Sequence, residues 1–351
     1  MVRRPVTIST GVVAGKDIGN KDFGDEWQAS SVTLMPRSLR EAARDLRWES
    51  VCTIAQIGSR PVGLLPIYRR KGSAFPAAFT DPAKVAPEIF PGGIAASQYA
   101  LIGGASDMVA GPAVSRLLID DMAAAVKRSL VDAAYRWSEA SGLVGAALYV
   151  REQDLTAFIG ASGLARRSQP VDELSVLRLP PGGWEGYLAS LDQKRRSVVK
   201  RDLAKLNDLR LALRVTAASD IIAESLPLVR NIKDRHGVPE HVDLLEARLS
   251  DWAANQVGER IAFTARDSSS RLIAVSFGCL RGSVLEMCEI GLTNDPSVRQ
   301  LVYVEVMLYS PIRLAAAIGS EEITLGLGSV IPKKLRGATV TKVWAVGTDA
   351  K

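Results

Sequence analysis

The chain has 351 residues, of which 47% are hydrophobic, so two domains of roughly 150 residues could each bury a core. The formal net charge of +6 favours polyanionic partners such as RNA, DNA and nucleotide cofactors. No segment approaches the ~18 consecutive apolar residues that a membrane helix requires, so the sequence predicts no membrane-spanning helix.

The cysteines and the N-terminus indicate a reduced compartment. Cys52, Cys279 and Cys288 are an odd, scattered set, and "MVRRPVTISTGVVAGKD" lacks the apolar core of a signal peptide. The two histidines, His236 and His241, flank a Gly-Val-Pro sequence that predicts a loop. We therefore expect a cytoplasmic protein without a metal site.

The first half predicts a hairpin, a strand, a helix and a strand. In "WESVCTIAQIGSRPVGLLPIYRR", residues 48–70, two apolar runs surround the turn residues Gly58, Ser59 and Arg60. We then expect a strand at "YALIGG", a helix over 113–140, a strand over 145–150, a helix over 154–161 and a strand over 174–179. The "PPGG" segment is typical of a linker. The expected domains are therefore residues 1–180 and 181–351.

The second half repeats this order after two helices expected over 220–235 and 241–256. Residues 261–292, "IAFTARDSSSRLIAVSFGCLRGSVLEMCEIGL", predict three strands joined by short turns. A helix over 298–318 and a strand over 323–328 follow. The repetition predicts a duplicated α/β (α+β) architecture with mixed sheets.

A strongly basic helix opens the second half at "LDQKRRSVVKRDLAKLNDLRLALRV". Val199, Leu203 and Leu206 have the spacing of a buried stripe. Around this stripe lie the basic residues Lys194, Arg195, Arg196, Lys200, Arg201 and Lys205. Two interpretations remain open, because such a run is typical both of a solvated helix face and of a surface that binds phosphates.

Two further motifs give the chain a family resemblance. A tryptophan-led helix ends in a Lys-Arg-Arg run at Trp184 to Arg196, and Lys333 is followed four residues later by Gly337. With the element order, these segments resemble the Fem-type aminoacyl-tRNA-dependent transferases and related tandem GNAT-like, acetyltransferase-like proteins. The resemblance covers about residues 48–346. The chain departs from the family in having Arg336, where an aromatic residue usually precedes the late glycine.

The resemblance implies two tandem GNAT-like domains and transfer of an aminoacyl group from charged tRNA to an amine. Such a reaction needs a cationic surface for the donor's phosphates, stabilisation of an oxyanion and a route for a proton. The expected phosphate-binding residues are Lys194, Arg195, Arg196, Lys200, Arg201 and Arg336. Lys333, expected in a loop beyond the last strand, would neutralise a phosphate or an oxyanion.

Candidates for the proton route are Glu286, Glu289 and Tyr303. Strict alternation predicts that the two glutamates lie on opposite faces of their strand, so at most one would point into a cleft. We prefer Glu289, although cross-strand pairing with Arg or Lys is a competing interpretation for both. Tyr303 would donate a proton to a leaving oxygen, and a core tyrosine is its alternative role.

An acyl-coenzyme A N-acyltransferase of the same fold is the main alternative. Such enzymes bind the cofactor's pyrophosphate on backbone N–H groups of a glycine-rich loop at a helix N-terminus. The corresponding segment, "TNDPSVRQLVYVEV", has no glycine, and Pro296 lacks an N–H donor. We therefore expect aminoacyl-tRNA as co-substrate and no other cofactor, with acetyl-coenzyme A if the alternative holds. A third possibility is a non-catalytic RNA-binding protein.

Overall fold

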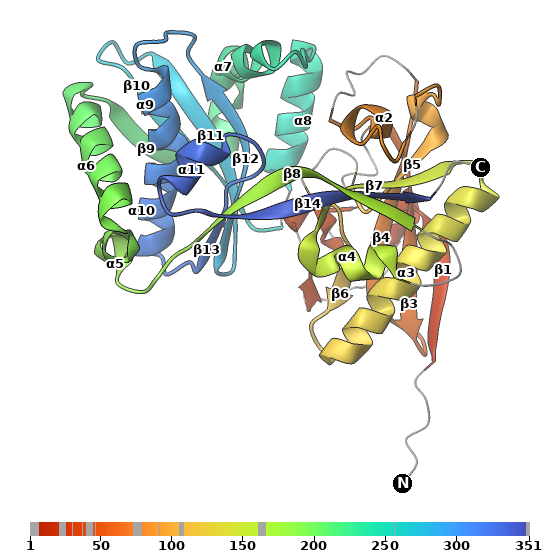
Figure 1. The fold of residues 1–351 in the computed structure, drawn as a ribbon. Helices are drawn as coiled ribbons and strands as arrows, with labels where there is room; N and C mark the ends of the chain where they lie inside the picture. The colour runs from red at the N-terminus through yellow and green to blue at the C-terminus, as the bar shows by residue number, and fades with distance from the viewer. Residues whose placement is uncertain are drawn as a thin grey trace. The chain divides into compact units, whose positions relative to one another are not determined.

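The computed structural model describes residues 7–20, 26–29, 31–36, 38–39, 45, 47–72, 79–90, 92–104, 109–160, 166–255 and 257–348. Residues 1–6, part of the segment in which we predict no signal peptide, lie outside these ranges. The chain forms two compact units, Met1–Asp172 with Lys342–Lys351, and Glu173–Thr341 (Figure 1). Compared with the expected division at residue 180, residues 173–180 group with the second unit and the C-terminal strand returns to the first.

The first unit is built on a mixed sheet. Its strands are β1 (Ile8–Ala14), β2 (Trp27–Gln28), β3 (Trp48–Ile57), β4 (Arg60–Arg70), β5 (Tyr99–Ile102), β6 (Ala113–Ser115), β7 (Val144–Arg151) and β14 (Thr339–Thr348). They pair in the order β1-β3-β4-β5-β7-β14, with β6 between β4 and β2. The β5–β7 pair is parallel, whereas β3 and β4 form the predicted antiparallel hairpin.

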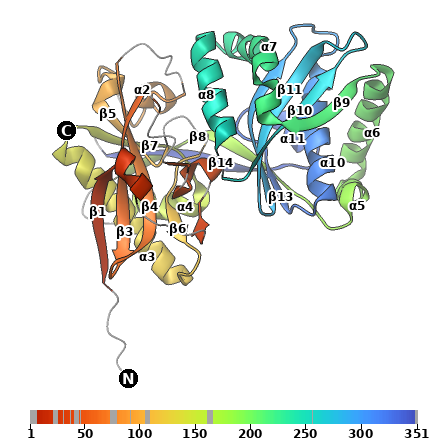
Figure 2. The same ribbon diagram turned by 180° about the vertical axis from the view of Figure 1, so that it is seen from behind.

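One long helix covers a face of this sheet. The helices are α2 (Pro82–Val85), α3 (Asp120–Ala140) and α4 (Glu152–Ile159), with 3-10 turns η1 (Gly15–Asn20), η2 (Val32–Leu34) and η3 (Ala96–Gln98). α3 packs on β1, β3 and β4 (Figure 2). The predicted helix over 113–140 is wrong at its start, because Val114 pairs with Gly63 in the sheet and the helix begins only at Asp120.

The second unit also contains parallel and antiparallel strands. They are β9 (Ala212–Ala217), β10 (Glu259–Arg266), β11 (Leu272–Arg281), β12 (Val284–Leu292) and β13 (Glu322–Thr324), together with the end of β8 (Arg166–Arg178) from Glu173 onwards. They follow the order β8-β13-β12-β11-β10-β9. β10, β11 and β12 form the predicted meander, and β12 and β13 are parallel.

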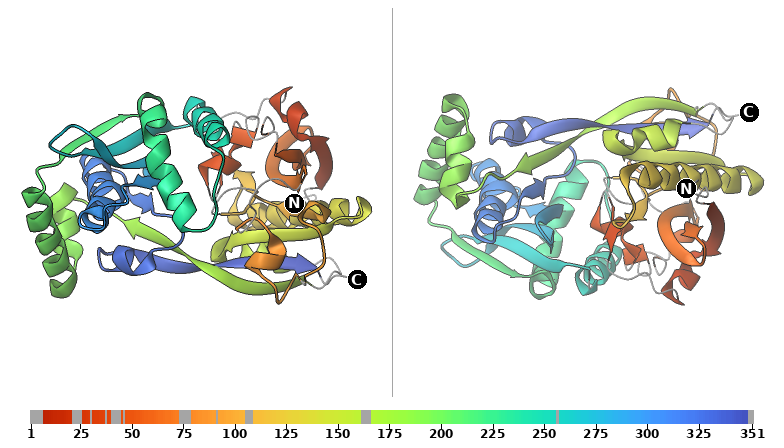
Figure 3. Two further views of the ribbon diagram at one scale, coloured as in Figure 1. Left: turned by 90° about the horizontal axis from the view of Figure 1, so that it is seen from above. Right: turned by 90° about the horizontal axis from the view of Figure 1, so that it is seen from below.

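Helices cover both faces of the second sheet (Figure 3). They are α5 (Gly183–Ser190), α6 (Gln193–Asp208), η4 (Ala218–Ile221), α7 (Ile222–Arg235), α8 (Val242–Ala254), α9 (Arg299–Val304), the π-helical η5 (Glu305–Tyr309), α10 (Ser310–Ala317) and α11 (Val330–Lys334). Strand alternation places Phe263 in the core under α5, α6, α9 and α10, and Ala262 in the core under α7 and α8.

The predicted repetition is present in the topology. In the first unit, β3, β4 and β5 are followed by α3 and then by β7, which is parallel to β5. In the second, β10, β11 and β12 are followed by α9 to α10 and then by β13, which is parallel to β12. In the part of the chain that the structure describes, no helix is long and apolar enough to cross a bilayer, and no three metal-ligating side chains gather.

Candidate active site

Two neighbouring strands of the second sheet separate at the candidate site. β12 pairs with β13 only from Val284 to Glu286. After β13 ends, Leu325 donates to the backbone carbonyl of Ser175, whereas β12 continues to Leu292. Ligands of sheets with parallel strands commonly bind where neighbouring strands part. The residues around this opening are therefore the first candidates for chemistry.

Lys333 lies beside the end of β13, but in the short helix α11 and not in the expected loop. Only 2% of the residue is exposed. Its Nζ donates to the backbone carbonyls of Gly326, Leu327 and Gly328 at 3.1, 3.0 and 2.8 Å. An ammonium has three N–H donors, so these carbonyls occupy all of them. Lys333 therefore holds this loop and would act on a reacting group through its electric field.

The loop held by Lys333 has an unusual backbone. Gly326, Gly328 and Ser329 have φ values of 71°, 64° and 44°. Glycine adopts positive φ freely, whereas a serine at φ 44° is uncommon. Strand β13 consequently ends at Thr324, short of the predicted residue 328. The bonds from Lys333 help to keep Ser329 in this conformation.

The two motifs of the family resemblance are in contact. The Tyr187 hydroxyl on α5 donates to the backbone carbonyl of Arg336 at 2.9 Å. Gly337 has φ 94°, and a Cβ at this position would lie 2.8 Å from a side-chain carbon of Leu191. The late glycine is therefore needed both for its backbone conformation and for the close approach of the α5 segment.

Arg336 is buried, in contrast to the phosphate-binding position that we expected. Its Nε donates to the Tyr309 hydroxyl at 2.9 Å, and its Nη1 donates to the Pro332 carbonyl at 2.8 Å. Its Nη2 is paired with the Asp202 carboxylate on α6. Burial opposes the charged form, but Tyr309 and Asp202 outweigh it and raise the pKa of Arg336. All three guanidinium nitrogens therefore have partners within the protein.

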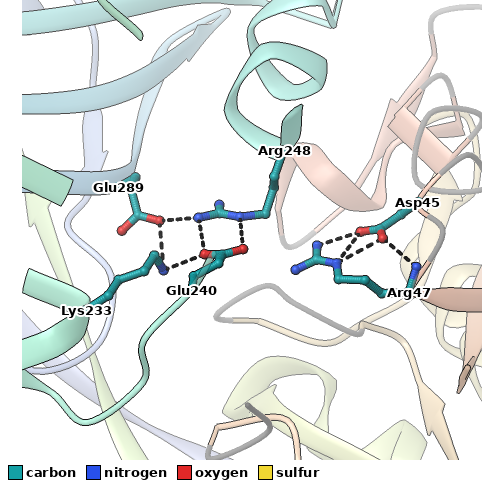
Figure 4. A network of polar contacts seen from close by, with 6 residues as sticks. All are labelled: Asp45, Arg47, Lys233, Glu240, Arg248 and Glu289. Atoms are coloured by element: carbon teal, nitrogen blue, oxygen red, sulfur yellow. Dashed lines mark hydrogen bonds and ion pairs between the residues drawn. The ribbon is translucent and has the colours of Figure 1, made fainter. Parts of the chain in front are cut away.

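Glu289 belongs to a closed ring of ion pairs (Figure 4). Arg248 of α8 lies 2.8 Å from Glu289 and 3.2 Å from Glu240, and Lys233 of α7 lies 3.3 and 3.4 Å from the same carboxylates. Burial opposes ionisation of Glu289, but Arg248 and Lys233 outweigh it, so its pKa is lowered. A paired carboxylate with a lowered pKa is a weak general base.

Glu286 and Glu289 lie on the same face of the sheet, so the predicted opposite placement is wrong. Glu286 is opposite Cys279, which is two residues from Phe277 in the core under α7 and α8. Glu289 contacts these same helices. The register between β11 and β12 shifts at residues 276–278. A bulge adds a residue to one strand and thereby breaks strict alternation.

Tyr303 on α9 has a buried hydroxyl that makes no hydrogen bond of good geometry. Burial raises the pKa of Tyr303, while the Ser329 hydroxyl and the Arg336 charge act in the opposite direction. The phenol therefore stays protonated at neutral pH, with its O–H near the Ser329 hydroxyl and in no hydrogen bond of good geometry.

Helix α6 confirms the predicted buried stripe. Val199 and Leu206 are buried, and Leu203 packs against the same core. The opposite side carries Lys194, Arg201 and Lys205, and Lys200 flanks the stripe; all four cations are exposed. None of these four makes an ion pair within the described ranges. The exposed face of α6 is therefore free to bind phosphates.

Two of the predicted phosphate-binding arginines have local partners. Arg195 lies 3.4 Å from Asp192, the residue that caps the N-terminus of α6. Arg196 donates to the backbone carbonyls of Leu188, Ala189 and Leu191 at the end of α5, at 3.1, 3.3 and 2.8 Å. Arg196 therefore satisfies the free carbonyls of one helix end, which is a structural role.

The turn before α9 does not resemble a pyrophosphate site. The Asp295 carboxylate accepts hydrogen bonds from the Ser297 N–H at 2.9 Å and from the Ser297 hydroxyl at 2.6 Å. These bonds lower the pKa of Asp295, which is therefore ionised. An acidic group occupies the backbone donor that a pyrophosphate would need, and it would repel the ligand.

Comparison with known proteins identifies the fold. The chain aligns with FemX over 96% of both chains, with 11% identity and a TM-score of 0.58. It aligns with the C-terminal domain of a putative lysylphosphatidylglycerol synthetase from Agrobacterium fabrum over 92% of this chain and 89% of that chain, with 10% identity and a TM-score of 0.57. It also aligns with a tandem GNAT protein from the clavulanic acid biosynthesis pathway, over 98% of this chain and 99% of that chain, with 10% identity and a TM-score of 0.52. No family model and no curated protein sequence matches.

Proposed function

The chain has the tandem GNAT fold of the Fem-like structures, and we propose that it is an acyltransferase that moves an aminoacyl group from aminoacyl-tRNA to an amine. The FemX and clavulanic-acid-pathway structures support acyl transfer as the general activity, because their chains match almost throughout. The finer assignment concerns the donor. It depends on one observation, the exposed cations of α6 that lack carboxylate partners among the described residues.

The α6 face suits a polyanion better than a small cofactor. Lys194 and Arg201 lie seven residues apart and Arg201 and Lys205 four, so the three share one side of the helix and extend along it. Contacts with several phosphates add up in an RNA and release counterions. The ionised Asp295 before α9, in contrast, disfavours a coenzyme A pyrophosphate. Aminoacyl-tRNA is therefore the preferred donor, and no further cofactor is proposed.

The proposed reaction forms an amide from an ester. The acceptor nitrogen bonds to the aminoacyl carbonyl carbon, the ester bond to the ribose oxygen breaks, and the amine proton ends on that oxygen. Tyr303 would donate its proton to the leaving oxygen and take up the proton that the attacking amine loses. Glu286 lies on the opposite face of the sheet from Tyr303 and has no part in this route. Lys333 would stabilise the oxyanion at a distance, while Glu289 orients α7 and α8. We place the reaction in the cytoplasm, where free cysteines such as Cys52 stay reduced.

A donor competition experiment tests this proposal. The protein is incubated with an amine acceptor and either a mixture of aminoacyl-tRNAs or acetyl-coenzyme A, and amide formation is followed by mass spectrometry. We expect transfer from tRNA that is lost when the donor is first digested with ribonuclease. Transfer from acetyl-coenzyme A alone would replace the tRNA proposal, and tight RNA binding without any product would indicate a non-catalytic RNA-binding protein.

A further inference from the structure

Three side chains of the first unit lie in one row across neighbouring strands. Trp48 at the start of β3 is opposite Arg70 at the end of β4. The β4–β5 register runs through Arg69 and Ala100, so Tyr99 is the next residue, opposite Arg70. Directly opposite residues of antiparallel strands have side chains on the same face. The row therefore spans two strand spacings, about 10 Å.

This row lies on the face of the sheet that α3 does not cover. Ile67 and Ala100 pack in the core under α3, so alternation directs Tyr68, Arg70 and Tyr99 to the other side. The rings of Trp48 and Tyr68 meet edge to face with centroids 6.3 Å apart. Arg70 is flanked by aromatic side chains, Trp48 on β3 and Tyr99 on β5.

Each member of the row is buried and has an unused polar atom. The exposed fractions of Trp48, Arg70 and Tyr99 are 8%, 8% and 1%. Trp48 Nε1, Arg70 Nε and the Tyr99 hydroxyl make no hydrogen bond. Arg70 forms no ion pair among the described residues, and its Nη1 and Nη2 atoms, unlike Nε, are not among the fully buried atoms without a partner. Buried polar atoms without a partner are unfavourable, so these three donors, which have no partner among the described residues, are open to an acceptor.

The charges around Arg70 leave its guanidinium available. Asp45 is already paired with Arg47 (Figure 4). The Asp81 carboxylate accepts a hydrogen bond from the Ala83 N–H, at the start of α2, and forms no ion pair with Arg70 in the described part of the chain. Burial lowers the pKa of Arg70, Asp81 opposes this shift and Arg47 adds to it. The guanidinium remains cationic because its ordinary pKa of 12.5 is far above neutrality.

We propose that Trp48, Arg70 and Tyr99 form a binding site for one oxyanion group, a carboxylate or a phosphate, of a small ligand. The row offers only donors towards such a group: an indole N–H, a guanidinium and a phenol O–H. Arginine binds both kinds of oxyanion by paired, charge-assisted hydrogen bonds. The site consists entirely of residues of the first unit and goes beyond the proposed acyl transfer, on which it does not depend.

Thermal unfolding and calorimetric titration of the full chain test this site, with inorganic phosphate and succinate as probes at constant ionic strength. We expect one probe to bind with saturation and to raise the melting temperature by about 5 to 10 °C at roughly a hundredfold excess over its Kd. The more effective probe identifies the oxyanion. A failure of both to bind would overturn the proposal and leave ordered water as the partner of these donors.

The variants separate binding from structure. Arg70→Met should abolish the probe-dependent shift while leaving the melting temperature without probe unchanged or higher, because it removes a buried Nε–H that lacks a hydrogen bond. Arg69→Met, at an exposed neighbour on the other face, should keep the full shift. Trp48→Phe and Tyr99→Phe should each weaken binding about 3- to 10-fold. A lower melting temperature of Arg70→Met together with an unchanged probe response would show that Arg70 is structural.

Discussion

The Asp202 carboxylate on α6 is paired with the buried Arg336 guanidinium after α11. Tyr309 joins them, because its hydroxyl donates to Asp202 at 2.5 Å and accepts from Arg336 at 2.9 Å. The one partly buried acid of the basic helix is therefore the group that attaches this helix to the segment containing Lys333. A change at this pair should affect both the donor-binding helix and the proposed active site.

Breaking this pair from one side should be costly. Arg336→Met leaves Asp202 ionised and poorly solvated, and Asp202→Leu leaves Arg336 in the same condition, so each should lower the free energy of unfolding by about 3 to 5 kcal/mol. The double variant should lose much less free energy of unfolding than the two single variants lose together. Urea unfolding of the four proteins gives the coupling energy. Additive losses would show that the pair is not coupled.

Lys333→Met should weaken the loop over residues 326–329. Three carbonyls lose a charged donor, so we expect the free energy of unfolding to fall by about 2 to 4 kcal/mol. If the ammonium also stabilises the oxyanion, turnover should fall by about 10² to 10³ under conditions where the variant is folded. Chemical unfolding and single-turnover kinetics measure the two effects separately. A fully active variant would remove Lys333 from the catalytic proposal.

Tyr303→Phe should separate catalysis from stability. The substitution removes a buried hydroxyl without a hydrogen bond, so the variant should be as stable as the wild type or slightly more stable. If the phenol protonates the leaving oxygen, turnover should fall by about 10² to 10⁴ with little change in KM. Tyr135→Phe provides a control with unchanged turnover, because it removes a hydroxyl that donates to the Val346 carbonyl within the first unit and is no part of the candidate site. Unchanged turnover in Tyr303→Phe would exclude the proposed acid.

The salt dependence of tRNA binding should report on the α6 face. Substituting Lys194, Lys200 and Arg201 by Gln removes three exposed cations without touching the buried stripe. If all three contact phosphates of a single-stranded acceptor end, the slope of log affinity against log salt should decrease by about two units. Arg196 is not among them, because Arg196→Gln should instead lower stability through the end of α5.

A matched variant controls for net charge in this titration. Arg230, Arg235 and Arg271 are exposed residues of the same unit outside α6, and their substitution by Gln removes the same charge. Its salt slope should stay close to that of the wild type. Equal slopes for both triple variants would mean that α6 contributes only general electrostatic attraction, and the tRNA proposal would lose its main support.

The ion-pair ring around Glu289 should make stability depend on pH. The folded-state pKa of Glu289 is lowered from 4.5, so its contribution is fully present above the unfolded-state pKa and is lost as pH falls through the folded-state pKa. Glu289→Gln should cost about 3 kcal/mol near pH 7. This difference from the wild type should shrink below about pH 4.5. Urea unfolding between pH 3.5 and 7 measures it, and a pH-independent difference would contradict the assignment.

The sequence alone determined the repeated element order, the hairpin at Gly58 and the buried stripe of α6. These features depend on local periodicity and on turn residues, which act over a few neighbours in the chain. The fold class followed from them, because two sets of strands with an intervening helix bury their apolar faces in few ways. The family resemblance pointed to the same fold, which the solved structures confirm.

Only the tertiary structure decided what the polar side chains contact. A bulge in β12 put Glu286 and Glu289 on one face, and Arg196 and Arg336 turned from the expected phosphate sites to partners inside the protein. The row of Trp48, Arg70 and Tyr99 brings together residues from three strands. Polar groups take whichever partners the packing of distant segments brings within hydrogen-bond reach, and local sequence does not specify that packing.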